Sequence, residues 1–346
     1  MEVAIRADAS DLIGVGHVSR CASLGLRLIA KGYKVHFIAS EMNEWLVEML
    51  TEFGFGFTRL PIECVKDAQL DAQLSALVTD KLEDCRWVIV DHYGLDKEWE
   101  SILRKTKKKV MIIDDENLRE HDCDVLLDTS LRNADKDVYK DQLSHRPIVF
   151  SGPSYVVLRP EFDRPSLIRS RSGEISKILV YFGGGEVEVE IRKVISALSL
   201  ITSRTLEVSV VFGKPQPDKS LVDDLLRLNP NLDVIGISLN MANLIKEADL
   251  AIGTCGVSAW ERCALGLPAL TVITTDNQRD DSRFLNDVGA IKSLGKSNEV
   301  EESTWLWEIS KLLNNPTEVL KMSSACLKLN VAQKDAQKRL IEIFEC

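Results

Sequence analysis

The sequence predicts an α/β protein built on parallel β-sheets. Short apolar runs alternate with longer amphipathic segments in the first half of the chain, and the same alternation returns in the second half. This alternation is typical of strands that are joined by crossover helices. The chain has 346 residues, more than one hydrophobic core usually organises. We therefore expect two domains of this class.

The apolar runs mark the expected strands. They cover residues 3–5, 35–38, 87–90, 110–113 and 125–127 in the first half, and 178–182, 208–212, 232–235, 250–252 and 269–272 in the second half. A helix is expected over 18–31, and the chain is expected to be helical after Glu299.

The segment 151–165 is rich in residues that break helices and strands, and is predicted to be an interdomain linker. It separates an N-terminal domain at 1–155 from a second domain at 170–330. The remaining segment, 331–346, is expected to be a helix that could pack back on the first domain.

Composition and charge exclude several classes of function. The chain is 45% hydrophobic and 28% charged, as in globular proteins, and charged residues within the first thirty replace the core of a signal peptide. No apolar run approaches the ~18 residues of a membrane span. We therefore expect a cytoplasmic protein without membrane insertion. A net charge of −10 argues against general nucleic-acid binding. The eight cysteines lack zinc-site spacing and are expected to be reduced.

A candidate catalytic residue follows the first predicted strand. His17 ends the glycine-bearing loop 6–17 and begins a predicted helix on the carboxyl side of the sheet, where open α/β sheets bind ligands. A helix N-terminus disfavours the imidazolium form, so His17 could act as a general base. The alternative is a capping or surface histidine.

Polar residues close two further strands at the same edge. Asp91-His-Tyr-Gly94 follows the run 87–90, and Asp114-Asp115 follows 110–113. Asp114 and Asp115 could cap the following segment or form a polar network around a sugar. No Asp-x-Asp signature accompanies them, so we expect no metal.

The second half contains a predicted anion site. Residues 253–268 predict a strand end, a tight glycine turn, a helix and a new strand, with Gly256, Val257 and Ser258 at the helix N-terminus, where a phosphate can bind. A second glycine cluster, Gly183-Gly184-Gly185, follows the run 178–182. An ordinary turn is the alternative for this cluster.

Three other polar residues lie near these turns. Glu261, about one turn into the helix, could accept hydrogen bonds from ribose hydroxyls, or could pair with Arg262 or Lys246. Asn277 and Gln278 follow the run 269–272 and are neutral amides, suited to acetamido or hydroxyl groups.

The first loop does not fit a dinucleotide site. Gly14-Val-Gly16 lacks the third glycine before the helix, and Ala39-Ser40 stands where an acidic residue ends the second strand in such sites. These two features exclude a Rossmann dehydrogenase.

Several motifs occur in one order along residues 1–280. They are Arg6-x-Asp8-Ala-Ser10, Ile13-Gly-x-Gly-His17-x-x-Arg20-Cys21, Val90-Asp-His-Tyr-Gly94, Ile113-Asp-Asp115, His121-Asp-Cys-Asp124, Leu158-Arg-Pro-Glu-Phe162, Trp260-Glu-Arg-Cys-Ala-Leu-Gly-Leu-Pro268 and Asn277-Gln278. Together they resemble the UDP-sugar hydrolases of pseudaminic acid biosynthesis, which are related to the MurG-like glycosyltransferases.

The resemblance implies two Rossmann-like domains in a GT-B arrangement, with a cleft between them and the nucleotide held mostly by the second domain. It also implies inverting hydrolysis of UDP-2,4-diacetamido-2,4,6-trideoxy-β-L-altropyranose to free sugar and UDP, without metal or other cofactor. In this resemblance His17 is the base, and Glu261 binds ribose. The expected sugar contacts are Asp8, Ser10, Gly14, Gly16, Tyr93, Asn277 and Gln278. The expected diphosphate contacts are Gly183, Gly184, Gly256, Val257 and Ser258.

One segment departs from the family pattern. Gly185 is followed by Glu186-Val-Glu-Val-Glu190, where a serine or aspartate and neutral polar residues are expected. Each carboxylate facing a diphosphate would cost about 1 kcal/mol. We expect these carboxylates to point outward or to cap the helix.

Two alternative functions remain from the sequence. A MurG-like glycosyltransferase would need an acceptor site, and glutamates along 41–52 would repel anionic lipid there. A non-catalytic nucleotide-sugar binding protein would bind without turnover. We expect a monomer or a weak oligomer.

Overall fold

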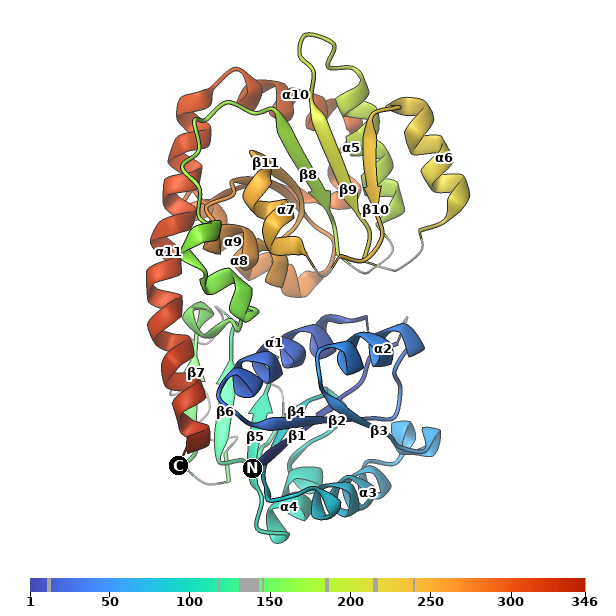
Figure 1. Cartoon of the computed structure of the whole chain (residues 1–346), viewed down its shortest axis with the longest axis vertical. Helices are drawn as coiled ribbons and strands as arrows, with labels where there is room; N and C mark the ends of the chain where they lie inside the picture. Colours follow the sequence, from blue (N-terminus) through green and yellow to red (C-terminus); the bar gives the residue numbers. More distant parts are fainter. Residues whose placement is uncertain are drawn as a thin grey trace. The chain divides into compact units, whose positions relative to one another are not determined.

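The computed structural model describes residues 1–10, 14–116, 119–130, 143–144, 146–183, 187–213, 217–238 and 240–345, and only the backbone of 330–333. The chain divides into two compact units (Figure 1). Unit 1 consists of Met1–Pro160 and Gln333–Cys346, and unit 2 consists of Glu161–Ala332. The division falls inside the segment that the sequence predicts to be a linker.

Unit 1 is built on a parallel sheet of seven strands in the order β3-β2-β1-β4-β5-β6-β7. The strands are β1 (Glu2–Ala7), β2 (Lys34–Ala39), β3 (Gly56–Arg59), β4 (Cys85–Asp91), β5 (Lys109–Ile113), β6 (Val125–Asp128) and β7 (Ile148–Ser151). The helices are α1 (Gly16–Ala30), α2 (Glu44–Glu52), α3 (Ala68–Lys81) and α4 (Lys97–Lys105), with 3-10 turns η1 (Ile62–Lys66) and η3 (Pro153–Tyr155).

Two hydrophobic clusters cover the two faces of this sheet. Side chains alternate along β1, so that Val3 and Ile5 join the cluster under α1 and α2, whereas Ala4 joins the cluster under α3 and α4. The chain end completes the first cluster, where Phe344 packs against Trp87 with ring centroids 4.9 Å apart. The C-terminal segment is therefore part of the core of unit 1.

Unit 2 has a parallel sheet of six strands in the order β10-β9-β8-β11-β12-β13. The strands are β8 (Lys177–Tyr181), β9 (Glu207–Val211), β10 (Leu232–Ile235), β11 (Leu250–Thr254), β12 (Ala269–Ile273) and β13 (Ile291–Lys296). The helices are α5 (Glu188–Ser199), α6 (Lys219–Leu228), α7 (Met241–Glu247), α8 (Val257–Ala264), α9 (Arg279–Asp287), α10 (Glu302–Leu313) and α11 (Pro316–Glu342), which continues into unit 1. Short 3-10 turns of unit 2 are η4 (Pro160–Asp163), which begins at the boundary, η5 (Pro165–Leu167), η6 (Asp276–Gln278) and η7 (Ser297–Glu299), whereas η8 (Ile343–Glu345) follows α11 in unit 1.

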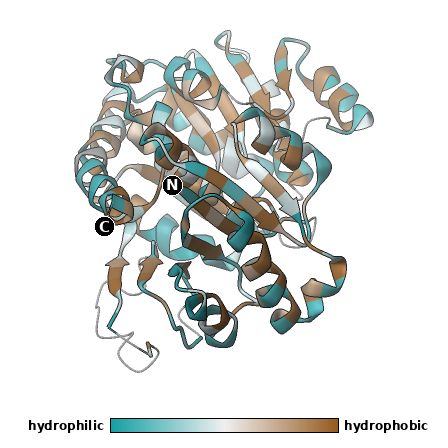
Figure 2. Ribbon diagram, turned by 60° about the horizontal axis from the view of Figure 1, so that its bottom comes forward, coloured by the Kyte–Doolittle hydropathy of each residue, from teal (hydrophilic) through white to brown (hydrophobic). Residues whose placement is uncertain are grey.

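The predicted fold class is confirmed, because both sheets are parallel and have the doubly wound order. Most strands are apolar and the helices are mixed (Figure 2). In each sheet the order reverses at one place, between β1 and β4 in unit 1 and between β8 and β11 in unit 2. Ligands of such sheets bind at the carboxyl ends of the strands beside this switch point.

Three strands were missing from the sequence prediction, namely β3, β7 and β13. Each lies at an edge of its sheet and is partly exposed. An edge strand has only one neighbour and buries less surface, so its apolar run is short and easily overlooked.

Helix starts differ in how their free N–H groups are satisfied. Asp67, Asp96 and Asp218 cap α3, α4 and α6 by accepting a backbone N–H. Among the described residues, no side chain caps α1 or α8 and no acid lies in the first turn of either helix. The positive ends of α1 and α8 are therefore not neutralised by these residues.

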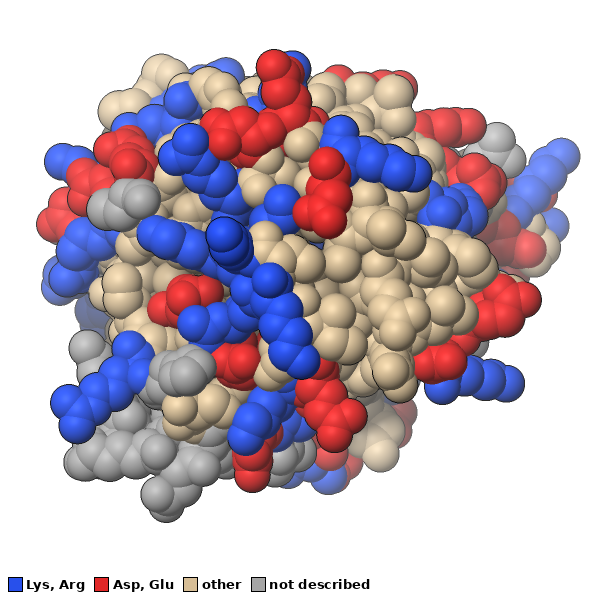
Figure 3. All heavy atoms as spheres, turned by 90° about the horizontal axis from the view of Figure 1, so that it is seen from below, with Lys and Arg blue, Asp and Glu red and all other residues tan. Residues whose placement is uncertain are grey.

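The surface of the face in Figure 3 carries interspersed basic and acidic side chains. No helix in the described part of the chain combines the length and the apolar character that a bilayer span requires.

Candidate active site

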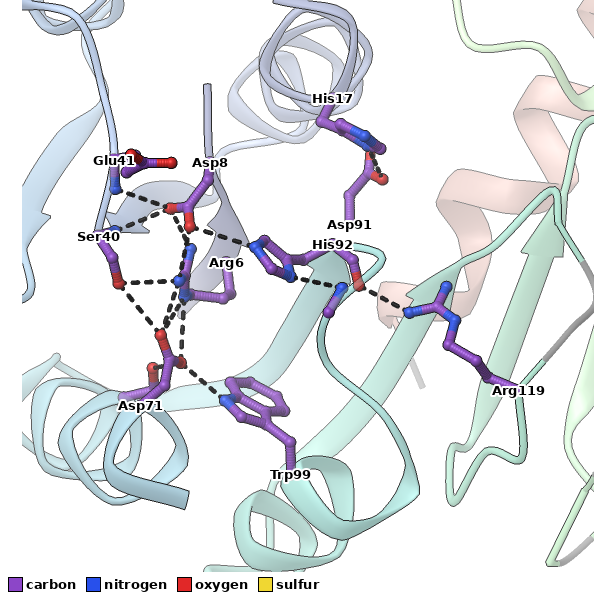
Figure 4. Close-up of polar contacts among 12 residues, drawn as sticks. Arg6, Asp8, His17, Ser40, Glu41, Asp71, Asp91, His92, Trp99 and Arg119 are labelled. Carbon is purple, nitrogen blue, oxygen red and sulfur yellow. Dashed lines mark hydrogen bonds and ion pairs between the residues drawn. The ribbon is translucent and has the colours of Figure 1, made fainter. Parts of the chain in front are cut away.

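His17 lies at the carboxyl end of β1, and β4 orients its ring. Its Nδ1 is 2.6 Å from Oδ1 of Asp91, the fully buried last residue of β4 (Figure 4). Only 10% of the His17 side chain is exposed. An ionised carboxylate only accepts hydrogen bonds, so Nδ1 carries a proton, and in the neutral ring the lone pair therefore lies on Nε2. This arrangement is that of a general base with an orienting carboxylate.

Arg20 extends this pair into a closed set of contacts. Its Nε and Nη2 donate to the two oxygens of Asp91, and its Nη1 donates to Asp115 at 2.8 Å. Asp115 also accepts a hydrogen bond of 2.7 Å from the hydroxyl of Tyr93. The Tyr93 ring packs edge-on against His17, with centroids 4.6 Å apart. We call these five residues the dyad ring.

The charges of the dyad ring keep Asp91 ionised. Burial alone would raise the pKa of this carboxyl group, but the charge of Arg20 and the hydrogen bonds from Arg20 and His17 hold the pKa well below its usual range. Burial and the neighbouring Asp115 raise the pKa of the Tyr93 phenol, which therefore remains a donor. A proton taken up at Nε2 of His17 would thus create an imidazolium beside a carboxylate.

A second, buried network lies behind the loop after β1. Arg6 donates to Asp8 and to Asp71 on α3, and Asp71 also accepts from Trp99 Nε1 at 2.7 Å. Asp8 is 1% exposed and also accepts the N–H of Ser40 at 2.8 Å. Burial would raise the pKa of Asp8, but hydrogen bonds from His92 and Arg6 lower it. The hydrogen-bonding capacity of the Asp8 carboxylate is therefore taken up by other residues of the protein.

His92 connects this network to the turn that carries Tyr93. Its Nδ1 accepts the N–H of Gly94 at 3.0 Å, so Nε2 holds the proton and lies 3.3 Å from Asp8. Arg119 holds the other side of the turn, since it donates to two of its carbonyl oxygens at 2.9 and 2.8 Å. Its guanidinium lies 5.5 Å from the centre of the Tyr93 ring. Both contacts fix the position of Tyr93.

Asp114 and His121 anchor Arg119 in turn. Asp114 pairs with Arg119 at 3.0 Å, and His121 bridges Asp114 at 2.9 Å and Glu100 at 2.6 Å. Burial alone would lower the pKa of His121, but its hydrogen bonds to Asp114 and Glu100 raise it to about 9. His121 is thus a buried cation between two carboxylates. Asp114 belongs to this support, whereas Asp115 belongs to the dyad ring.

In unit 2 the turn between β11 and α8 presents backbone rather than side chains. A Cβ built on Gly256 would meet no atom within 4 Å, so the space beside it is open. A Cβ on Gly253 would lie 1.9 Å from the carbonyl oxygen of Tyr181, because β8 and β11 approach closely there. Val257 and Ser258 are partly buried in the first turn of α8.

The glycine loop after β8 is described only in part. Gly183 has φ +94° and open space beside it, whereas Gly184, Gly185 and Glu186 lie outside the described residues. The expectation that the acidic run points outward or caps the helix is wrong for Glu190. That residue is buried on α5 and pairs with Lys193 at 3.0 Å. Lys193 neutralises its charge within unit 2.

The remaining predicted residues of unit 2 lie on α8 and after β12, the neighbour of β11. Glu261 is buried on α8. Gln278 accepts the backbone N–H of Thr274 at 3.1 Å, so its amide holds its own loop together. Asn277 is exposed, and its Oδ1 accepts from Thr275 at 2.6 Å.

The structure brings His17 and Tyr93 into contact and places Asp8 in the network behind them. Ser10 and Gly14 close the loop, with the Gly14 N–H 2.7 Å from the Ser10 carbonyl oxygen, and a Cβ on Gly16 would meet nothing within 4 Å.

Arg20 was not singled out from the sequence, and Asp91 and Asp115 were expected only as polar residues at the same sheet edge, not as partners of His17. Asp91 could have been found, since it ends the strand that pairs with β1 at the switch point. Arg20 follows His17 by three residues on α1 and so shares its helix face. Asp115 and Tyr93 follow two neighbouring strands, but no local signal predicts the hydrogen bond between them.

Metal ligands and disulfides do not contribute to the described site. Among the residues that the structure describes, no group of three or more His, Cys, Asp or Glu side chains could hold a metal ion. The seven described cysteines are free and buried.

The C-terminal half of the chain is similar to a known protein family. Residues 178–340 match the model of the glycosyltransferase family 28 C-terminal domain. The matched segment contains the turn before α8 and the loop after β12.

Curated relatives are similar over different shares of the chain. The UDP-2,4-diacetamido-2,4,6-trideoxy-beta-L-altropyranose hydrolase of Campylobacter jejuni is 23% identical over 84% of this chain and 97% of its own length. An uncharacterised protein of Methanocaldococcus jannaschii is 26% identical over 81% of this chain. The spore coat polysaccharide biosynthesis protein SpsG of Bacillus subtilis is 26% identical over 48% of this chain. The chain spans only 57% and 50% of the lengths of the latter two.

Solved structures establish the fold. MurG of Acinetobacter baumannii is 16% identical and has a TM-score of 0.65, with 99% of each chain covered. A UDP-glucosyltransferase of Polygonum tinctorium is 14% identical and has a TM-score of 0.68, with 100% of this chain and 98% of that chain covered. The chain therefore has the fold of GT-B glycosyltransferases, built from two Rossmann-like domains.

Proposed function

We propose that the chain is an enzyme that hydrolyses a UDP-activated sugar with inversion, releasing free sugar and UDP. The pair of His17 and Asp91 carries this proposal, because Asp91 binds Nδ1 and so directs the lone pair of the neutral imidazole to Nε2, at the switch point of unit 1. The similarity to the Campylobacter jejuni hydrolase supports the reaction class. The proposed substrate is UDP-2,4-diacetamido-2,4,6-trideoxy-β-L-altropyranose, which would place the enzyme in pseudaminic acid biosynthesis.

The proposed reaction needs one base. A water oxygen attacks the anomeric carbon from the face opposite UDP, while the bond between that carbon and the diphosphate oxygen breaks. Nε2 of His17 takes the proton of the water, and Asp91 stabilises the resulting imidazolium. UDP leaves with the electron pair of the broken bond, and a diphosphate is stable enough as an anion to leave without a second acid.

Unit 2 would hold the leaving group. We place the diphosphate at the uncapped start of α8, where the N–H groups of Val257 and Ser258 have no partner within the helix and Gly256 leaves open space. Gly183 is proposed to contribute a second backbone contact, together with Gly184. Glu261 is proposed to accept hydrogen bonds from the ribose.

We propose that the sugar is contacted by residues of three loops, which follow β1, β4 and β12. Tyr93, Asn277 and Gln278 would border the sugar, and Ser10, Gly14 and Gly16 would line the entrance to His17. We propose a different role for Asp8. Because its carboxylate binds Arg6 and His92, it would position the Tyr93 turn without contacting the sugar.

Proton NMR of the full chain with this UDP-sugar in water, without any acceptor, tests the proposal. The first free sugar to appear is expected to have the inverted anomeric configuration, with UDP released in equal amount. Product with retained configuration, or no product, would contradict the proposal.

A UDP-sugar glycosyltransferase is the second candidate. The family 28 match and the likeness to MurG favour it. A transferase would release UDP only when an acceptor sugar or lipid is added, so adding candidate acceptors to the same NMR assay separates the two reactions.

A further inference from the structure

Arg262 is a buried cation at the positive end of α8. It is 2% exposed and follows the helix start by about one turn. Its side chain reaches back, so that Nη2 donates to the carbonyl oxygen of Thr254 at 2.6 Å and Nη1 lies 3.4 Å from Oγ of Ser258. Its Nε has no hydrogen-bond partner among the described residues. No described carboxylate forms an ion pair with Arg262.

This position is unfavourable for a cation without an anion nearby. The N-terminus of a helix already carries about half a positive charge, which repels a guanidinium. Burial removes solvation as well, and it lowers the pKa of Arg262 below its usual value, although the charge of the neighbouring Glu261, which forms no ion pair with Arg262, partly opposes this shift. An unpaired buried charge lowers stability unless a partner compensates for it. The location therefore points to a negatively charged ligand.

Arg171 provides an internal contrast in the same unit. It is also buried, and burial lowers its pKa to about 10. Arg171 lies at the opposite, negative ends of helices, where it donates to carbonyl oxygens at the ends of α7 and α8. These are the oxygens of Ile245, Ala248, Leu265 and Gly266. Carbonyl oxygens satisfy Arg171 within the protein, whereas Arg262 forms one short hydrogen bond and one long one with the residues that the structure describes.

We propose that Arg262 recognises the diphosphate of the nucleotide at the start of α8. Its charge adds to that of the helix end, and Gly256 leaves open space for an anion. Because the guanidinium can only donate to Ser258 Oγ, it directs the hydroxyl proton of Ser258 away from itself, toward a phosphate oxygen. The inference rests on the proposed use of a UDP-sugar, but it concerns binding and not hydrolysis.

Calorimetric titration of the full chain with UDP and with uridine tests this role. Arg262→Gln is expected to weaken UDP binding about tenfold while changing uridine binding less than about twofold. Arg262→Lys keeps the charge and is expected to recover most of the UDP affinity. Arg171→Lys is the matched control, expected to change thermal stability without changing the ratio of the two affinities.

The outcomes separate recognition from a structural role. If Arg262→Gln leaves the ratio of UDP affinity to uridine affinity unchanged, because both affinities fall equally or neither falls, the inference is overturned. If Arg262→Gln does not fold, Ser258→Ala decides, with a selective loss of UDP affinity expected and an unchanged ratio counting against the role. Turnover is measured separately. If Arg262→Gln selectively loses UDP affinity but the wild-type chain hydrolyses no UDP-sugar, only the proposed hydrolase is rejected. If the wild-type chain hydrolyses the UDP-sugar but the ratio of UDP to uridine affinity is unchanged in the variant, only the role of Arg262 is rejected.

Discussion

The two sheets share one strand order, yet the loops at their switch points have opposite chemistry. After β1 and β4, unit 1 gathers the charged side chains of the dyad ring. After β8 and β11, unit 2 places glycines and the uncapped start of α8. Proton transfer needs a side chain with a defined orientation and protonation state, whereas anion binding needs backbone N–H groups without side chains in the way. One topology thus supports two different tasks.

The largest effect is expected from the base itself. His17→Asn should lower kcat about a thousandfold, because the lone pair of Nε2 is lost, and should leave the Kd of UDP within about twofold. NMR turnover and calorimetry measure the two quantities. His36→Asn is the control, since His36 lies on β2 and bonds Thr58. Equal losses of turnover and UDP affinity in His17→Asn would contradict the view that unit 1 supplies the base while unit 2 binds UDP.

A smaller effect should follow from the carboxylates of the dyad ring. Asp91→Asn should lower kcat about a hundredfold or more, because an amide no longer favours the required tautomer of His17. Asp115→Asn should cost about tenfold, since Asp115 reaches His17 only through Tyr93 and Arg20. Steady-state kinetics gives the ranking. A larger loss of kcat for Asp115→Asn than for Asp91→Asn would show that turnover depends more on the position of Tyr93 than on the pairing of His17 with Asp91.

The glycines of unit 2 should separate stability from binding. Gly253→Ala is expected to lower the free energy of unfolding by about 2–3 kcal/mol, because its Cβ would collide with the Tyr181 carbonyl. Gly256→Ala should change it by less than about 1 kcal/mol but weaken UDP binding about tenfold. Urea unfolding and calorimetry measure both variants. Unchanged UDP affinity in Gly256→Ala would show that the diphosphate does not bind at the turn before α8.

The last prediction concerns the pH dependence of stability, which involves no change in turnover. The pKa of His121 is raised from 6.5 to about 9 in the folded chain, so its contribution to stability is complete below pH 6.5 and is lost as pH rises through about 9. The loss should be about 3 kcal/mol in urea unfolding across this range, since a pKa change of one corresponds to about 1.4 kcal/mol. His121→Gln should flatten that part of the profile. A profile in His121→Gln that is as steep as in wild type would assign the loss to another group.

Sequence periodicity predicted the interior strands better than the edges. Interior parallel strands are buried on both faces and form continuous apolar runs, such as β4 and β8. The edge strands β3, β7 and β13 have a single neighbour, and β3 and β13 are of mixed composition, whereas β7 is only four residues long. The site was predictable to the same limited extent. His17 and Gly256 became candidates because a strand, a glycine and a helix start form a local pattern.

Contacts between distant residues could not be predicted from such patterns. The link between His17 and Asp91 spans 74 residues, and that between Arg6 and Asp71 spans 65. Arg262 illustrates the same limit within one helix. The sequence suggested a surface pair with Glu261, but the side chain is buried against the turn that precedes α8.

The sequence by itself determined the α/β class and the positions of the candidate base and of the glycine turns. These features depend on residues close together in the chain, because strand burial, helix starts and turns follow local patterns. Only the tertiary structure decided which charges pair, that the end of α11 completes the core of unit 1, and where the buried cations lie. Those outcomes depend on which distant residues meet when the sheets form, since burial makes an unpaired charge costly.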